Sequence, residues 1–461
     1  MEQVGLERGQ HVPRLTQHVL AQLVCLGSHT ITGILSTCGQ QFQDWSADYR
    51  MYGRNRVDPQ CLFDVVRKEL LAMDNEPVVA ALDDTRLPKT GKKVHGATYT
   101  RDPLGPPFHV NFIRAQRFLQ TSIALRERDG QARMLPVDWV HAPLPQKPGK
   151  KATDKEQFQY RQAREKARIG YVGAERIAHL RHWMDQNEAV NRRLWAVVDG
   201  SFTNGTVLKN LAHHTTLVGR IRSDAKLYFL PHQQPDKGRR RVYGEQAPTP
   251  EELRQDSKHP WENVEVYFGG HRRTLRAKSL TGLRWRAAGQ QHTLQLIVIA
   301  PTPYRLTQQG KLLYRKPAYL ICTDPEAPLN DVIQHYLWRW DIEVNFRDEK
   351  TLIGVGQAQV RTPAATQNVT GIAVAAYAIL LLAAEKCRRE GNTTQHLPPP
   401  KWQRKSAKRD TTASLIRNLR YELWAQSIQF SSFNTKEHTS TKAEKYKIRP
   451  DSAVFYAARY T

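Results

Sequence analysis

The sequence predicts an α/β protein in which a mixed β-sheet carries the functional residues. Two short apolar runs of the kind that forms buried strands, at 78–82 and 194–198, are each followed directly by an aspartate. Between them, residues 150–187 form a charged segment with helical apolar spacing, which predicts one long helix. In sheets covered by helices, polar residues at the ends of buried strands commonly form the functional site.

Further runs of strand-forming residues belong to the same predicted sheet. Residues 118–125 and 134–141 precede the helix, and 318–322 return to the strand pattern later in the chain. Between 223 and 315, proline, glycine and arginine become frequent and short alternating segments appear, with a strong strand candidate at 293–300. We therefore expect a β-rich insertion that interrupts the α/β core.

The N-terminal part has a helical pattern. Val19, Leu23 and Val24 are spaced as on one helix face. Basic side chains lie among such positions: Arg50, Arg54, Arg56, Arg67 and Lys68. A small DNA-binding region and simple packing of these helices on the core both fit the pattern. The expected organisation is a helical N-terminal DNA-binding region (1–75), a first core part (76–222), the β-rich insertion (223–316), a second core part (317–390) and a basic C-terminal region (391–461).

The chain of 461 residues is strongly basic. Lys and Arg number 69 against 44 Asp and Glu, which gives a formal net charge of +25. An excess of this size causes self-repulsion that a polyanion relieves, so we expect a nucleic acid partner. An anionic membrane is the weaker alternative, because no basic amphipathic helix or lipidation motif stands out.

Cysteine usage and hydropathy favour a cytoplasmic protein. The five cysteines are scattered and form no CxxC pair, so neither a zinc knuckle nor a disulfide framework is expected. The first residues lack the apolar run of a signal peptide. Residues 369–384 resemble a short membrane span, but they include Thr370 and Gly371 and fall short of the usual length, which predicts a buried core helix.

The most informative segment is a predicted long helix that Asn330 can cap and that begins at Asp331. Four side chains within it stand at offsets of zero, three, seven and fourteen: Tyr336, Arg339, Glu343 and Lys350. At about 100° per residue, the first, third and fourth share one stripe and the arginine lies beside it. Such a face suits a metal-binding carboxylate with cations that hold a phosphate. The alternative is a solvated i,i+4 ion pair between Arg339 and Glu343.

This spacing resembles the Y-(2)-R-(3)-E-(6)-K signature of bacterial insertion-sequence transposases of the cut-and-paste type, which have an RNase H-like core. Residues 83–85 and 88–93 resemble the family's segment around its first aspartate, and 195–199 resemble the segment around the second. A β-rich insertion between the second aspartate and the glutamate is also similar to this family. The resemblance spans approximately residues 70–385 and implies an RNase H-like mixed-sheet catalytic core with such an insertion.

The resemblance implies a catalytic DDE triad of Asp83, Asp199 and Glu343 that binds two metal ions. Phosphodiester cleavage needs an activated water and a stabilised leaving oxygen, and two Mg²⁺ ions supply both. Mg²⁺ prefers the hard oxygen ligands of Asp and Glu, and we expect Mn²⁺ to substitute for it. Asp83 and Asp84 compete for the first position, because successive strand residues point to opposite faces. The family pattern of aspartate, any residue and threonine favours Asp83.

The resemblance also implies DNA contacts on the predicted helix. Arg339 and Lys350 would hold phosphates at the transposon end, and Tyr336 would hydrogen-bond near the scissile phosphate. Trp340 would stack on a displaced base. Alternatively, Trp340 belongs to an apolar stripe of its helix and packs in the core.

The implied activity is that of a transposase, an endonuclease that cuts at transposon ends and transfers the resulting 3′-hydroxyl into target DNA. Its partners would be double-stranded DNA, as terminal inverted repeats and as target, and a second copy of the chain on that DNA, with no membrane. The protein would be cytoplasmic and associated with the nucleoid. Two alternatives to a transposase remain open. One is a catalytically silent DNA-binding protein derived from a transposase, and the other is an RNase H-like nuclease without strand transfer.

Overall fold

The structure is a computed structural model in which the chain divides into two compact units. The helical unit comprises residues 1–66, 90–95 and 346–461, and the sheet unit comprises 67–89 and 96–345. The residues that the structure describes are 11–54, 56–102, 105–106, 108–127, 130–235, 238–289, 291–307, 309–391, 409–427 and 457.

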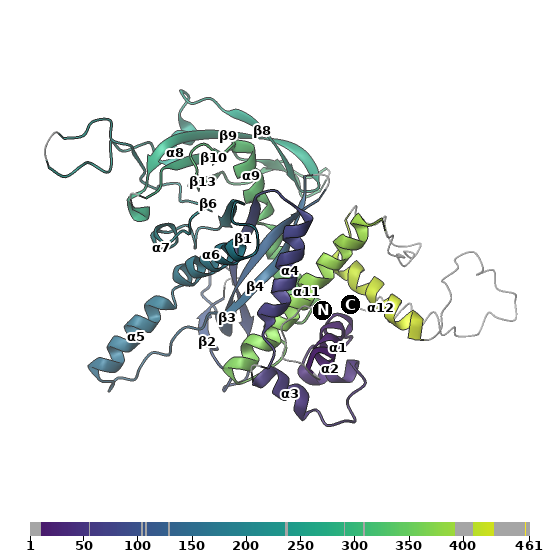
Figure 1. Cartoon of the computed structure of the whole chain (residues 1–461). Coiled ribbons are helices and arrows are strands. Elements are labelled where there is room, and N and C mark those ends of the chain that lie inside the picture. Colours follow the sequence, from purple (N-terminus) through teal and green to yellow (C-terminus); the bar gives the residue numbers. More distant parts are fainter. Residues whose placement is uncertain are drawn as a thin grey trace, which may run out of the picture. The chain divides into compact units, whose positions relative to one another are not determined.

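The sheet unit is built on a mixed sheet of eleven strands, which confirms the predicted α/β class (Figure 1). Strands β1 and β5 are parallel, as are β5 and β6, and the other named pairs are antiparallel. The order along the sheet is β2 (Thr98–Arg101), β3 (Phe112–Arg126), β1 (Val78–Pro88), β5 (Leu194–Val198), β6 (Thr215–Arg220), β13 (Ala318–Cys322), β10 (Leu294–Ile299), β9 (His271–Arg284) and β7 (Tyr228–Phe229), with β4 (Ala132–His141) on β3 and β8 (Glu262–Phe268) on β9.

The core of this unit lies around the central strands. Every residue of β5 and of β10 is buried, as expected for apolar strands that are covered on both faces. Helix α9 (Leu329–Trp338) packs against β4, β5 and β6, and α6 (Ile169–Gln186) packs against β3. The strands predicted at 194–198 and 318–322 coincide with β5 and β13.

The β-rich segment between 223 and 316 is hydrogen-bonded into this same sheet. Strand β10 pairs with β13 of the core, and β9 pairs with β10. The segment also contains α8 (Pro250–Gln255), the 3-10 turn η1 (Arg286–Ala288) and a separate two-stranded pairing of β11 (Pro303–Tyr304) with β12 (Leu313–Tyr314). The main strands of this segment therefore extend the core sheet.

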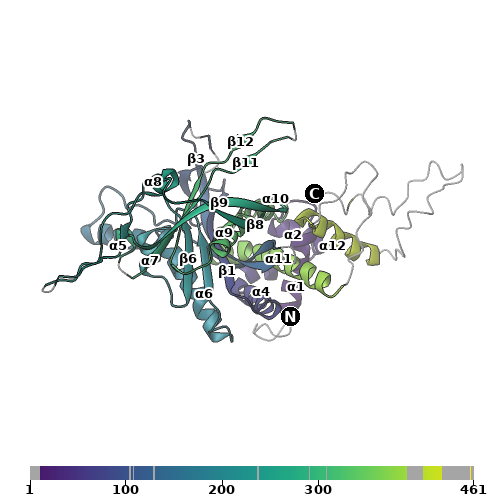
Figure 2. The same ribbon diagram turned by 90° about the horizontal axis from the view of Figure 1, so that it is seen from above.

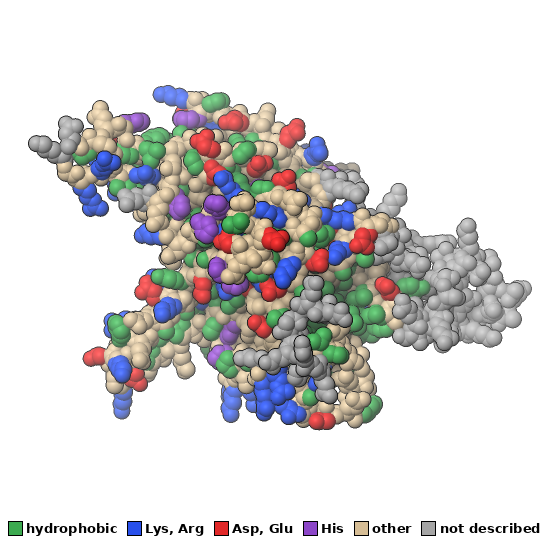
Figure 3. Space-filling model, in the orientation of Figure 1, with side chains coloured by type: hydrophobic (Ala, Val, Ile, Leu, Met, Phe, Trp, Pro, Cys, Tyr) green, Lys and Arg blue, Asp and Glu red, His purple; other side chains and the backbone are tan. Residues whose placement is uncertain are grey.

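The prediction of one continuous helix over 150–187 is wrong. Helix α5 (Asp154–Lys166) is followed by α6, and between them Arg168 has an extended backbone. Thr153 begins α5 with a capping box to Glu156, and no side chain of α5 is buried. Figures 1 and 3 show α5 extending away from the sheet with both basic and acidic side chains. Only α6 has the expected buried stripe, which includes Ile177, Leu180 and Met184.

The helical unit is centred on α11 (Pro363–Arg389), against which α1 (His11–Val24) packs (Figure 2). Helix α3 (Ser46–Gly53) also packs against α11. Also present are α2 (Ile31–Thr37) and α12 (Thr412–Ser427), and the unit boundaries fall within α4 (Pro59–Met73) and α10 (Asp341–Thr351). Among the described helices, α11 is the one long and apolar enough to cross a membrane, and 72% of its most apolar window is buried. This confirms the predicted core helix over 369–384.

Arg67, one of the basic residues of the predicted N-terminal DNA-binding region, belongs to the sheet unit. Arg67 is buried, donates a hydrogen bond to the Val137 carbonyl at 3.2 Å and lies 5.0 Å from the centroid of the Trp183 ring. For this residue the structure agrees with the second of the two alternatives, packing of the helix on the core. Most of the predicted basic region over 391–461 lies outside the described residues.

The five cysteines are all free, in agreement with the spacing that argued against a disulfide framework.

Candidate active site

Asp83 lies inside strand β1 and not after its end, which corrects the prediction of a strand that stops at Leu82. The antiparallel pairing with β3 continues through Asp83 as far as Pro88. The parallel pairing with β5, however, ends where Leu82 faces Val198. Because these two residues are register partners, Asp83 and Asp199 leave the parallel pair at the same edge. The sheet thereby brings together two aspartates that are far apart in the sequence.

The two neighbouring aspartates of β1 have different partners. The carboxylate of Asp84 pairs with Arg86 on the same strand. The carboxylate of Asp83 lies 3.3 Å from the guanidinium of Arg339 and also accepts a hydrogen bond from the Asp84 backbone N–H at 2.8 Å. This division follows from the alternation of side chains along a strand. Asp83 is the one that faces Arg339.

Asp199 is held by the turn that follows β5. Ser201 donates from its backbone N–H at 2.9 Å and from its hydroxyl at 3.2 Å to the two carboxylate oxygens. Thr203 donates twice to the Asp199 carbonyl, from its backbone N–H at 3.1 Å and its hydroxyl at 2.7 Å. Strand β6 leaves room for this turn only because residue 219 is glycine, since a Cβ there would overlap the Thr203 side chain. The direction of the Asp199 carboxylate is thus fixed locally.

The predicted long helix that begins at Asp331 with an Asn330 cap is wrong in two respects. Helix α9 begins at Leu329 with Pro328 at the N-cap. The helix is also interrupted after Trp338, and α10 begins at Asp341. At the interruption, hydrogen bonds span three residues instead of four, from Ile342 and Glu343 back to the preceding turn at 3.1 Å each. Tyr336 therefore lies on α9, whereas Glu343 and Lys350 lie on α10.

The interruption has a tertiary cause. Asp341 accepts a hydrogen bond from the backbone N–H of Met134 on β4 at 2.9 Å. Asn345 donates to the carbonyl of the same residue at 2.8 Å and is itself buried. These two bonds attach the first turn of α10 to a strand. Sequence reasoning missed Asp341 and Asn345, because the partner is a backbone group about 200 residues away.

Arg339 occupies the interruption and connects two of the predicted site residues. Its guanidinium lies 3.3 Å from the carboxylate of Asp83 and 3.3 Å from that of Glu343. The Arg339 side chain is 8% exposed, so the ion pair is not the solvated surface pair that the sequence left open. A buried guanidinium is neutralised here by carboxylates from a strand and from a helix.

Asp199 is close enough to Asp83 to affect the ionisation of the Asp83 carboxyl. Burial and, to a smaller extent, the negative charge of Asp199 together raise the pKa of the Asp83 carboxyl to about 7, against the opposing charge of Arg339. Additional positive charge beside this carboxyl would favour its ionised form. The electrostatics therefore favour a cation beside these two aspartates.

The donor set suits a hard divalent cation, because Asp83, Asp199 and Glu343 offer only carboxylate oxygens. The described residues contain no group of three His, Cys, Asp or Glu side chains close enough together to hold one metal ion. The guanidinium of Arg339 provides the positive charge between Asp83 and Glu343. Metal binding by these carboxylates thus requires side-chain rearrangement, for which the 40% exposed Glu343 has room.

Of the other predicted DNA-contacting residues, Tyr336 and Trp340 lie near the interruption and Lys350 does not. The guanidinium of Arg339 is 5.7 Å from the centroid of the Tyr336 ring. Trp340 is 57% exposed, so the alternative that it packs in the core is wrong. Lys350, on α10, belongs to the helical unit, and its ammonium lies 5.9 Å from the centroid of the Phe346 ring.

A mixed sheet that carries carboxylates at one edge is the arrangement expected of an α/β enzyme that cleaves phosphodiesters. A family model described as DDE superfamily endonuclease matches residues 5–292, which is more than half of the chain. The chain belongs to this family. The matched region contains Asp83 and Asp199 and ends before Glu343. No curated protein matches the chain.

Membership in this family has direct consequences. DDE superfamily endonucleases are nucleases and transposases, so the chain is an enzyme that acts on DNA. The family generally uses divalent metal ions such as Mg²⁺, which agrees with the carboxylate donor set described above. The basic composition of the chain fits a DNA substrate.

Proposed function

We propose that this protein is a cut-and-paste transposase of the insertion-sequence type, with an RNase H-like core and the Y-(2)-R-(3)-E-(6)-K signature. Asp83, Asp199 and Glu343 would be its catalytic carboxylates. The observation that supports this most strongly is the position of Arg339, which contacts Asp83 and Glu343 at 3.3 Å each. The effect of the Asp199 charge on the pKa of Asp83 links the third carboxylate to the same place.

In this proposal Asp83, Asp199 and Glu343 would hold two Mg²⁺ ions, or Mn²⁺ in their place. Such ions, when bound, activate an attacking water and stabilise the leaving oxygen of a phosphodiester. The hydrogen bonds from Ser201 keep the Asp199 carboxylate in a fixed direction. Arg339, displaced from the carboxylates, would contact a DNA phosphate with the planar fork of its guanidinium.

The proposed reaction on DNA has two stages. Hydrolysis of one strand at a terminal inverted repeat exposes a 3′-hydroxyl, and that hydroxyl then attacks a phosphodiester of the target. Two copies of the chain are expected, because two transposon ends must be joined in one complex. Tyr336 and Lys350 would contact phosphates at the end, and Trp340 would stack on a displaced base. The reaction would take place in the cytoplasm at the nucleoid.

The test uses the full-length chain with a labelled DNA fragment that contains the sequences flanking its gene, a target plasmid and Mg²⁺ or Mn²⁺. We expect nicking followed by joining of a 3′-end to the plasmid. Asp83→Ala, Asp199→Ala and Glu343→Gln should each abolish nicking and retain DNA binding. Asp84→Asn is the matched control for the first aspartate and should retain nicking.

Other outcomes identify the alternatives. Tight binding to the flanking DNA with no nicking in either metal would indicate a catalytically silent DNA-binding protein. Cutting without any joining of a 3′-end to the plasmid would indicate a nuclease without strand transfer. Retained nicking in all three carboxylate variants would exclude the proposed triad.

A further inference from the structure

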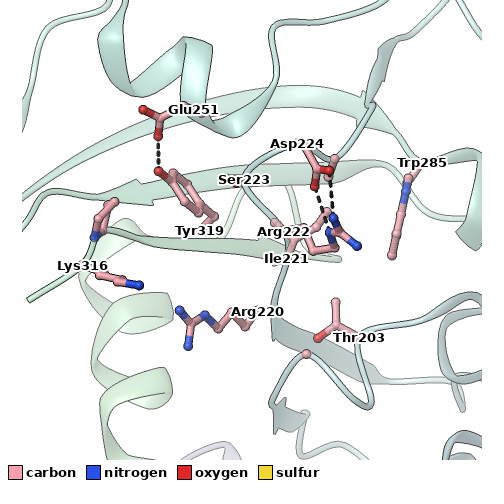
Figure 4. Close-up of a pocket in the computed structure, with 13 residues that line it drawn as sticks. Thr203, Arg220, Ile221, Arg222, Ser223, Asp224, Glu251, Trp285, Lys316 and Tyr319 are labelled. Atoms are coloured by element: carbon pink, nitrogen blue, oxygen red, sulfur yellow. Dashed lines mark hydrogen bonds and ion pairs between the residues drawn. The ribbon is translucent and has the colours of Figure 1, made fainter. Parts of the chain in front are cut away.

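A cavity of about 840 Å³ lies in the sheet unit beside the turn that holds Asp199. Gly200 and Thr203 of that turn line it, together with Arg220 at the end of β6 and Lys316 just before β13 (Figure 4). Trp285, which precedes η1, closes the opposite side. Thr203 also holds the Asp199 turn, whereas Arg220, Lys316 and Trp285 have no part in the carboxylate site described above. The cavity is therefore a separate surface next to one of the proposed catalytic residues.

The acidic groups of the cavity are neutralised by partners. Asp224 forms a two-point ion pair with Arg222, at 2.9 and 3.0 Å. Glu251 receives hydrogen bonds from Arg254 and from the Tyr319 hydroxyl, and these hold the pKa of its carboxyl at about 2. The Tyr319 hydroxyl is itself kept protonated, because burial raises its pKa to about 12.

The two remaining cations of the cavity have no such compensation. Arg220 and Lys316 are both exposed, and among the described residues neither has a carboxylate within ion-pair distance. Figure 4 shows their side chains on the same side of the cavity, away from Trp285. The cavity therefore carries uncompensated positive charge on one side, which favours an anionic ligand.

Trp285 faces the cavity, whereas several other aromatic and basic side chains of the β-rich segment are covered by, or bonded to, other groups of the protein. Trp261 is covered by Lys278, whose ammonium lies 4.7 Å from its ring centroid. Arg286 lies 4.1 Å from the centroid of the Tyr228 ring, and Arg284 donates to the Val242 carbonyl at 2.8 Å. Trp285 is half-buried and faces the cavity, where its indole can act as a stacking platform.

The volume of the cavity favours a single nucleic acid strand over a duplex as its ligand. The cavity volume is in the range of pockets that enclose small ligands, roughly 300–1,000 Å³. That is enough for a few nucleotides and too small for a duplex. Cations beside an aromatic platform are the combination that binds single strands without sequence preference. Thr203 lines the cavity and donates to the main-chain carbonyl of Asp199, so a strand held there would lie close to this residue.

We propose that this cavity binds a single DNA strand, with Arg220 and Lys316 contacting phosphates and Trp285 stacking on a base. The inference rests on the proposed function for its choice of DNA, and it adds a strand-holding site that neither the triad nor the signature helix provides. Its role would be to keep an unpaired strand beside Asp199 while the other strand is processed.

The test measures equilibrium binding in EDTA, so that it does not depend on cleavage. The probe is a fluorescein-labelled oligothymidylate of eight nucleotides, and anisotropy is recorded over a salt series. Arg220→Ala combined with Lys316→Ala should weaken binding about tenfold or more and should reduce the salt slope of log Kobs by roughly 0.7 for each lost phosphate contact. Trp285→Ala should weaken binding about tenfold with the salt slope unchanged.

Arg222→Ala combined with Asp224→Ala is the matched control, because it removes an ion pair of the cavity without changing the net charge, and it should bind the probe nearly as the unchanged protein does. If Trp285→Ala fails to fold by circular dichroism, Trp285→Leu takes its place. Probe affinity that is unchanged in the double and tryptophan variants overturns the inference. An equal loss for a blunt duplex of the same length also overturns it, because the site would not select a single strand.

The two proposals can fail separately. Pocket-dependent binding of the oligothymidylate without any metal-dependent nicking would contradict the proposed transposase and leave the strand site intact. Nicking and joining by the unchanged protein, with a strand affinity that the pocket variants do not alter, would leave the transposase and remove the strand site.

Discussion

The guanidinium of Arg339 lies 3.3 Å from the carboxylate of Asp83, although 256 residues separate them in the chain. The contact joins a strand of the sheet to the interruption between α9 and α10. It also puts a permanent cation where the proposed function requires divalent ions. If the proposed function holds, Arg339 and a metal ion would compete for the same carboxylate oxygens, and this competition would have measurable consequences.

Arg339→Met removes the positive charge and keeps a side chain of similar length. In EDTA we expect a loss of about 3 kcal/mol in the free energy of unfolding, because carboxylates lose a buried partner. Added Mg²⁺ should raise the melting temperature of the variant more than that of the unchanged protein, because the variant has no guanidinium that competes with the ion for the carboxylates. Thermal unfolding with and without Mg²⁺ measures both effects. Arg339→Lys, which keeps the charge, is the control, and an equal Mg²⁺ response in all three proteins would contradict the competition.

Asp83→Asn tests the raised pKa of this carboxyl through the pH dependence of stability in metal-free buffer. The carboxyl has a pKa of about 7 in the folded chain, against an ordinary aspartate pKa of 3.8 once the chain is unfolded. Between these values the folded chain keeps a proton that the unfolded chain has lost, so this contribution to stability falls as the pH rises and is gone above about 7. The amide does not ionise. The variant should therefore gain in melting temperature relative to the unchanged protein between pH 5 and pH 8.

Asp84→Asn is the control for this pH dependence, since Asp84 pairs with Arg86 on the same strand. Its melting temperature, relative to that of the unchanged protein, should show no comparable rise between pH 5 and pH 8. A parallel pH profile for the Asp83 variant and the unchanged protein would mean that Asp83 is ionised normally.

The parts of the fold that the sequence predicted well are those decided by local burial. The runs at 194–198 and 318–322 are apolar throughout and are buried on both faces, so pattern and structure coincide. Strand β1 was predicted too short, because Asp83 and the polar residues after it interrupt the apolar pattern. They remain in the strand since β3 pairs with them as far as Pro88. Tertiary pairing decides the end of that strand.

The site was predictable in composition and only partly in geometry. The resemblance to a transposase family pointed to the three proposed carboxylates, but the adjacency of Asp83 and Asp199 depends on the register between Leu82 and Val198. The interruption at Arg339 depends on hydrogen bonds to Met134. Neither register nor a distant backbone partner is visible in one sequence. The cavity beside Trp285 escaped prediction for the same reason.

Gly219→Ala tests the support of the Asp199 turn. A methyl group at 219 would overlap the Thr203 side chain, whose hydroxyl donates to the Asp199 carbonyl. We expect a loss of about 1–3 kcal/mol, as for overpacked sites, and weaker stabilisation by Mg²⁺. Gly200→Ala is the matched control, because a Cβ there meets only the Arg220 carbonyl at an ordinary 3.8 Å. Urea unfolding of both variants, with and without Mg²⁺, distinguishes them, and equal losses would show that the overlap with Thr203 is not what destabilises the Gly219 variant.

The neighbouring tryptophans Trp338 and Trp340 should respond in opposite ways to replacement by alanine. Trp338 donates to the Gly130 carbonyl at 3.3 Å and lies under the guanidinium of Arg126, so Trp338→Ala should lower the melting temperature. Trp340 is 57% exposed, so Trp340→Ala should leave the melting temperature nearly unchanged. If Trp340 stacks on a displaced base, its loss should instead weaken binding to end DNA that carries an unpaired base, by about 1–3 kcal/mol. Fluorescence of 2-aminopurine at that base reports the stacking, and a signal that is the same with and without Trp340 would exclude the role.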